Sequence, residues 1–89
     1  MKYIVTKNMD TEELEAFSFP ASVSHDCMAE VLGKIKNRFF GGWERVRREP
    51  VSAGFVDSTG WCYGESVSLG LRADTERDTN IFRSQMDTQ

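Results

Sequence analysis

The chain has 89 residues, of which 39% are apolar and 11% aromatic, and its formal net charge is −3. This length fits one domain and leaves no room for two cores, so we expect a single domain over residues 1–89. The apolar content excludes a wholly disordered chain, and the negative charge argues against a generic nucleic-acid-binding protein.

Two extended segments are expected near the start of the chain. Residues 2–6 are rich in β-branched and aromatic side chains and predict a first strand. Phe17 and Phe19 alternate with a polar residue, which favours a second strand over residues 14–19. A helix-cap pattern at residues 10–13 supports the alternative of a short helical turn there.

The clearest helix is expected over residues 25–37. Ser24 is a favourable N-cap, and Gly41-Gly42 ends the pattern. Apolar side chains recur at helical spacing and predict one buried stripe, made of Met28, Val31, Leu32, Ile35 and Phe39.

The pattern then becomes extended. Residues 43–56 predict a strand that is kinked or at a sheet edge near Pro50, because proline donates no ladder hydrogen bond. Residues 57–60 predict a turn, and residues 61–71 a returning antiparallel strand.

The returning strand has two different faces. Its large face is expected in the core and consists of Trp61, Tyr63, Val67, Leu69 and Leu71. Its small face suits either solvent or the close approach of another backbone, and we favour solvent; it consists of Cys62, Gly64, Ser66, Ser68 and Gly70.

Thr75 and Asp78 resemble a capping box, which predicts a C-terminal helix; the tail over residues 84–89 is expected to fray. The elements together predict an α+β domain with a mostly antiparallel sheet, in the order β-β-α-β-β-α. We expect both helices on one face of that sheet.

Charge is distributed unevenly along the chain. Residues 1–33 carry two Lys against six acids, and residues 49–89 three Arg against seven, so each flank is −4. Residues 34–48, the basic segment, carry six basic residues against Glu44, a net charge of +5. Such a dipole steers a partner, and the alternative is a solvated surface.

The basic segment also holds the residue types that anchor interfaces, tryptophan and arginine. The same mixture suits base stacking and phosphate contact, and a purely structural role for these side chains is the third alternative. The candidate partner-binding residues are Arg38, Trp43, Arg45, Arg47 and Arg48.

The residue pattern gives little support for a catalytic site or a metal site. His25 is the only histidine, and we expect it to be a polar residue at an exposed helix start rather than the partner of Cys27. The acidic group at residues 12–15 suits a solvated face, and no phosphate-binding glycine motif occurs. We therefore expect no enzymatic activity, no metal and no cofactor.

Neither a signal peptide nor an apolar run of membrane length is evident, so we expect a cytoplasmic protein with Cys27 and Cys62 as free thiols and no membrane association.

The runs at residues 53–56, 62–66 and 68–71 resemble small proteins encoded by bacterial prophages and other mobile elements. This resemblance implies an accessory role in a bacterium. The sequence predicts a non-enzymatic accessory protein that binds a macromolecule, preferably a protein, with nucleic-acid binding as the alternative.

Overall fold

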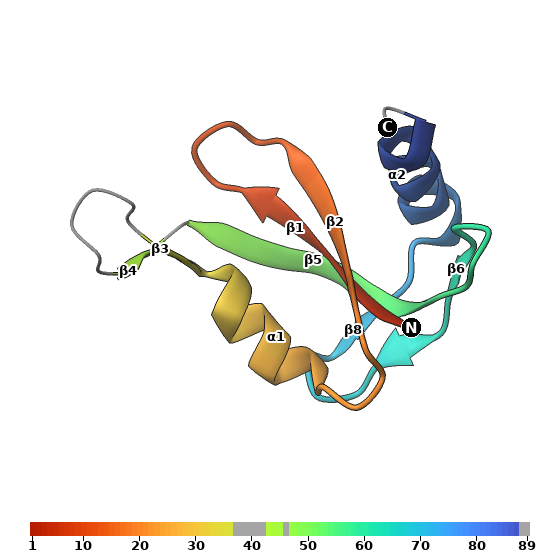
Figure 1. Cartoon of the computed structure of the whole chain (residues 1–89), viewed down its shortest axis with the longest axis horizontal. Coiled ribbons are helices and arrows are strands. Elements are labelled where there is room, and N and C mark those ends of the chain that lie inside the picture. The colour runs from red at the N-terminus through yellow and green to blue at the C-terminus, as the bar shows by residue number, and fades with distance from the viewer. Residues whose placement is uncertain (37–42, 46, 88–89) are drawn as a thin grey trace.

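The computed structural model describes residues 1–36, 43–45 and 47–87, and for residues 34–36, 43–45, 86 and 87 it describes the backbone. The fold is α+β with antiparallel strands, as predicted (Figure 1). Its main sheet has the strand order β2-β1-β5-β6, built from β1 (Lys2–Asn8), β2 (Leu14–Phe19), β5 (Arg48–Val56) and β6 (Cys62–Tyr63).

Two short ladders and two helices complete the described chain. Strand β3 (Lys34–Lys36) pairs with β4 (Trp43–Arg45), and β7 (Glu65–Ser66) pairs with β8 (Leu71–Arg72). The helices are α1 (His25–Leu32) and α2 (Thr75–Asp87). Among the described residues, no helix is both long and apolar enough to cross a membrane.

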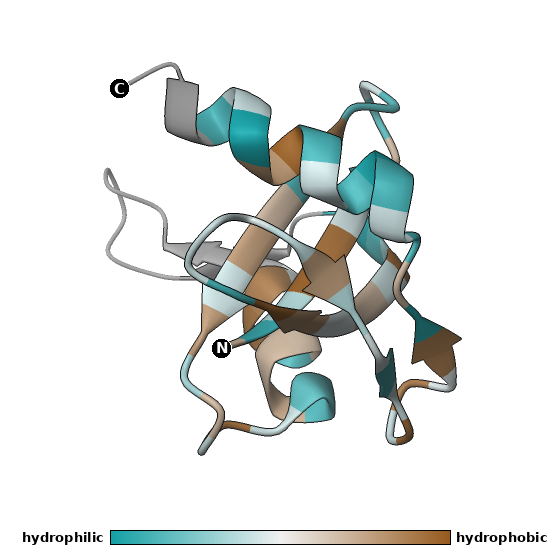
Figure 2. Cartoon of the chain, turned by 90° about the vertical axis from the view of Figure 1, so that its right-hand side faces the viewer, coloured by the Kyte–Doolittle hydropathy of each residue, from teal (hydrophilic) through white to brown (hydrophobic). Residues whose placement is uncertain are grey.

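The two helices lie on opposite faces of the main sheet, so the prediction of one shared face is wrong (Figure 1). Tyr3 and Val5 pack with Phe82 of α2, whereas Ile4 packs with Leu32 of α1. Neighbouring residues of a strand point to opposite faces. Because Tyr3, Ile4 and Val5 are all fully buried, strand β1 needs a helix on each side. Figure 2 shows α2 crossing the strands, mostly hydrophilic with one hydrophobic stretch.

Helix α1 is shorter than predicted. It ends at Leu32, and the N–H of Gly33 closes the last turn on the carbonyls of Ala29 and Glu30. Glycine is less favourable in a helix interior than every other residue except proline, which favours an end at this position. The backbone of Ile35 lies in β3 and does not continue the helix. The predicted stripe is therefore split: Leu32 is buried, Val31 is 57% exposed, and Phe39 lies outside the described residues.

Strand β5 contains a bulge beside Pro50, where an irregularity was expected. Val5 pairs with Ser52 but Thr6 pairs with Pro50, so Val51 is the extra residue. The turn at residues 57–60 is confirmed, with Gly60 at a φ of 88°.

The predicted continuous return strand is wrong. Gly64 and Gly70 adopt φ values of 80° and 65°, which break the chain into β6, β7 and β8. The large and small faces expected for residues 61–71 are therefore not preserved. Tyr63 and Val67 are 46% and 88% exposed, whereas Leu69 and Leu71 are partly buried against the core. Cys62 and Ser66 of the small face are buried, contrary to the solvent position that we favoured.

Helix α2 begins at Thr75, as predicted, but Asp74 is the residue that caps it. The Asp74 carboxylate accepts the N–H of Arg77, and the Asp74 N–H donates to Asp78 in return. The tail was expected to fray from residue 84. The helix continues to Asp87, and residues 88–89 lie outside the described part of the chain.

Candidate functional site

The predicted residues of the basic segment fall in different parts of the chain. Arg38 lies outside the described residues, and Trp43 and Arg45 are the first and last residues of β4, described by their backbone. Arg47 and Arg48 follow β4 and are described with their side chains. Arg47 forms an exposed ion pair with Asp10 at 3.3 Å, a contact of small energetic value.

Arg48 is directed into the fold. Its Nη1 donates to the carbonyl of Leu32 at 3.0 Å, and its guanidinium lies 5.4 Å from the centre of the Phe17 ring. Its Nη2 is 3.7 Å from the Glu15 carboxylate. A cation that binds the last carbonyls of a helix satisfies groups that have no partner within the helix. Arg48 thus holds the end of α1 against β2.

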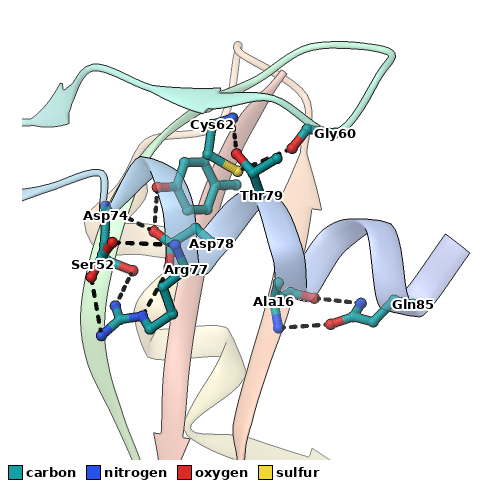
Figure 3. Close-up of polar contacts among 10 residues, drawn as sticks. Ala16, Ser52, Gly60, Cys62, Asp74, Arg77, Asp78, Thr79 and Gln85 are labelled. Carbon is teal, nitrogen blue, oxygen red and sulfur yellow. Dashed lines mark hydrogen bonds and ion pairs between the residues drawn. The ribbon is translucent and has the colours of Figure 1, made fainter.

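A polar cluster centred on a buried carboxylate joins α2 to strands β1 and β5 (Figure 3). We call it the Asp78 cluster, and it consists of Tyr3, Ser52, Asp74, Arg77 and Asp78. The fully buried Asp78 carboxylate accepts the Tyr3 hydroxyl at 2.5 Å, Nε of Arg77 at 3.2 Å and the N–H of Asp74 at 3.1 Å. Nη2 of Arg77 continues to the Ser52 hydroxyl at 3.0 Å.

The electrostatics of the Asp78 cluster favour a structural role. Burial, reinforced by the hydrogen bond to Asp78, raises the pKa of Tyr3 far above its usual range. Its hydroxyl therefore stays protonated and keeps donating. Arg77 balances the charge of Asp78, which a buried carboxylate requires. The Asp78 carboxylate itself is fully buried among these donors, so it is not presented to a substrate.

His25 is buried, so the prediction of an exposed polar residue is wrong. Its Nε2 donates to the Gly54 carbonyl at 2.9 Å, since a carbonyl can only accept. The edges of two aromatic rings, Phe19 and Phe55, contact the imidazole at centroid distances of 5.5 and 6.1 Å. His25 packs α1 onto the sheet, while Cys27 is exposed.

Cys62 is a further buried titratable group. Its N–H donates to the Thr79 hydroxyl at 3.0 Å, and its thiol lies 3.5 Å from the Gly60 carbonyl (Figure 3). Burial raises the pKa of the Cys62 thiol to about 11. The thiolate is the nucleophilic form, so this cysteine is inert at neutral pH. Both cysteines are free, and the described residues contain no group of three metal-ligating side chains.

Trp61 is 48% exposed, although it was expected in the core. The turn before it is held by one carboxylate oxygen of Asp57, which accepts the Thr59 N–H and hydroxyl at 2.8 and 2.6 Å and the Trp61 N–H at 3.1 Å. Nε of Arg83 on α2 donates to the Thr59 carbonyl at 3.4 Å. A large aromatic side chain is thus presented at the surface on a well-bonded backbone.

Sequence analysis missed Trp61 as a candidate site residue because it assumed one continuous strand after the turn. The only sequence signal for its position was the Asp57 to Gly60 turn itself. Comparison with family models, curated proteins and solved structures found no match to this chain.

Proposed function

We propose that this chain is a small non-enzymatic accessory protein that binds another protein. The observation that carries the proposal is the exposed Trp61 on its bonded turn. Tryptophan is enriched among the residues that dominate protein-binding energy. A side chain on a preorganised backbone also loses less conformational entropy on binding.

The state of the reactive side chains supports a binding role over an enzymatic one. His25 is packed between aromatic rings, the Asp78 carboxylate is fully hydrogen-bonded inside the fold, and the Cys62 thiol is protonated at neutral pH. Catalytic groups instead meet at a site that a substrate reaches. In these three cases the side chain supports packing.

The setting that we propose is the cytoplasm of a bacterium, on the basis of the resemblance to proteins of prophages and mobile elements. The basic segment remains a second candidate surface for the partner. Its arginines are also the basis of the alternative function, nucleic-acid binding, although Arg48 is engaged within the fold.

A capture experiment tests the proposal. Immobilised wild type, Trp61→Ala and Val31→Ala proteins are incubated with bacterial lysate, with and without nuclease. Val31 is the matched control because it is an exposed apolar residue on α1, across the sheet from α2.

We expect one protein to be retained in both nuclease conditions, to bind saturably once purified, and to bind Trp61→Ala about tenfold or more weakly, as for an anchor residue. Retention that disappears with nuclease would favour nucleic-acid binding. Equal binding by all three proteins would reject Trp61 as the anchor.

A further inference from the structure

The ring of Trp61 borders a hollow on the flank of α2. The hollow has a volume of about 320 Å³ and is lined by Trp61, Thr75, Glu76, Thr79, Asn80 and Arg83. The Cys62 N–H donates to the hydroxyl of Thr79, one of the lining residues, and this bond ties β6 to α2 beside the hollow. We call it the Trp61 hollow.

Two charged side chains line the Trp61 hollow, and they differ in their surroundings. Arg83 donates to the carbonyl of Thr59, the residue whose N–H and hydroxyl the Asp57 carboxylate accepts, so a negative charge lies in the turn beside it. Glu76 is exposed and forms no ion pair with the described part of the chain. The uncompensated charge at the hollow is therefore negative.

A tryptophan ring beside a carboxylate has a defined chemical preference. The ring face carries a negative quadrupole that attracts cations, and tryptophan is the strongest of the aromatic residues in this respect. Glu76 adds a direct counter-charge. The segment over residues 49–89, which supplies every residue that lines the hollow, has three Arg against seven acids, a net charge of −4 that attracts a basic partner.

We infer that the Trp61 hollow receives a lysine or arginine side chain from the partner protein. The inference rests on the proposed protein-binding function and adds the chemistry of the contact. The aliphatic part of such a side chain packs on the indole ring, while its cationic end reaches Glu76. Thr75 and Asn80 supply neutral hydrogen-bonding groups at the rim.

A fluorescence titration tests this chemistry without knowledge of the partner. The Trp43→Phe variant leaves Trp61 as the single tryptophan. The probe is a hexa-arginine peptide, and a hexa-glutamate peptide of opposite charge is its control. We expect a saturable change in Trp61 emission with hexa-arginine and none with hexa-glutamate.

In the same background, Glu76→Gln should weaken hexa-arginine binding about fivefold or more, which is the loss of one modest charge contact. Glu65→Gln is the matched control, because Glu65 is an exposed acid on β7 outside the hollow, and it should bind within about twofold of the parent. Circular dichroism of each variant verifies the fold.

Absence of saturation, or equal weakening by the two glutamine substitutions, would overturn the inference, since general attraction would then explain the binding. The capture experiment reports separately on the proposed function. A partner retained by wild type and by Glu76→Gln alike would leave protein binding standing and reject the cationic contact.

Discussion

Gln85 on α2 binds both backbone groups of Ala16 on the edge strand β2: its Oε1 accepts the Ala16 N–H at 3.1 Å, and its Nε2 donates to the Ala16 carbonyl at 3.2 Å (Figure 3). One side-chain amide thereby replaces the peptide group of a missing neighbouring strand. Open strand edges pair with other chains, and covering them is a common protection.

Replacing Gln85 by alanine should lower the free energy of unfolding by about 1–2 kcal/mol, because two hydrogen bonds are lost. Urea unfolding measures the change. Ser84→Ala, one residue earlier on the exposed side of α2, should change the stability by less than about 0.5 kcal/mol. Similar losses in both variants would mean that the Ala16 contact contributes nothing specific.

The Asp78 cluster predicts a second, larger effect. Tyr3→Phe removes a hydrogen bond to a carboxylate and should cost about 1.5–3 kcal/mol. Asp78→Ala removes the buried acceptor of the Tyr3 hydroxyl, of Nε of Arg77 and of the Asp74 N–H, and should cost about 3–5 kcal/mol. Tyr63→Phe, which removes a hydroxyl from a half-exposed ring, is the control and should be nearly neutral. Comparable losses for the two tyrosine variants would contradict the role of the cluster.

Alkaline pH should weaken the fold through Cys62. Its pKa rises from 9.0 to about 11 on folding, so the unfolded thiol ionises first. The stabilisation is complete below pH 9 and is lost as the pH rises toward 11, by about 2–3 kcal/mol. Tyr3, whose pKa is also raised, adds to the loss above pH 10.

Unfolding free energies measured between pH 8 and 10 isolate the thiol. Cys62→Ala should show a flatter pH dependence than wild type, whereas the exposed Cys27→Ala should retain the wild-type slope. An unchanged slope in Cys62→Ala would assign the alkaline loss to other groups.

Replacing either of two glycines by alanine should have different effects on stability. A Cβ atom at Gly54 would collide with the backbone carbonyl of Tyr63, so Gly54→Ala should separate β5 from β6 and cost about 1–3 kcal/mol. At Gly33 a Cβ atom would meet the Glu30 carbonyl at an ordinary 3.5 Å and φ is negative, so Gly33→Ala should change the stability by less than about 1 kcal/mol. Thermal unfolding distinguishes the two, and a neutral Gly54→Ala would contradict the close approach of the strands.

Elements set by local chemistry were predicted well from sequence. The alternation of Phe17 and Phe19 located β2, the Asp57 to Gly60 run located the turn, and the capping pattern of Thr75 and Asp78 located the start of α2. In each case the residues that determine the element lie within it.

Features set by distant contacts were not predicted. Burial keeps the same alternation from Cys62 to Val67 and changes only after the turn at Val67–Gly70, where Leu69 and Leu71 pack against the core; the alternation pattern contains no sign of this change. His25 is buried because Gly54, 29 positions later, presents a carbonyl to it. Trp61 was expected in the core because it shares its parity with Leu69 and Leu71, and the turn at Val67–Gly70 separates it from them.

The contact between Tyr3 and Asp78 also has a consequence for biosynthesis. The two residues are 75 positions apart, so the hydroxyl of Tyr3 leaves the ribosome long before its carboxylate partner is made. Strand β1 can pair with β2 early, but one face stays uncovered until α2 has been synthesised. Long-range contacts of this kind slow folding and leave apolar surface open to other chains in the interval. The nascent chain therefore completes its core late, and a ribosome that stalls between β5 and α2 holds a chain in which strand β1 is uncovered on one side.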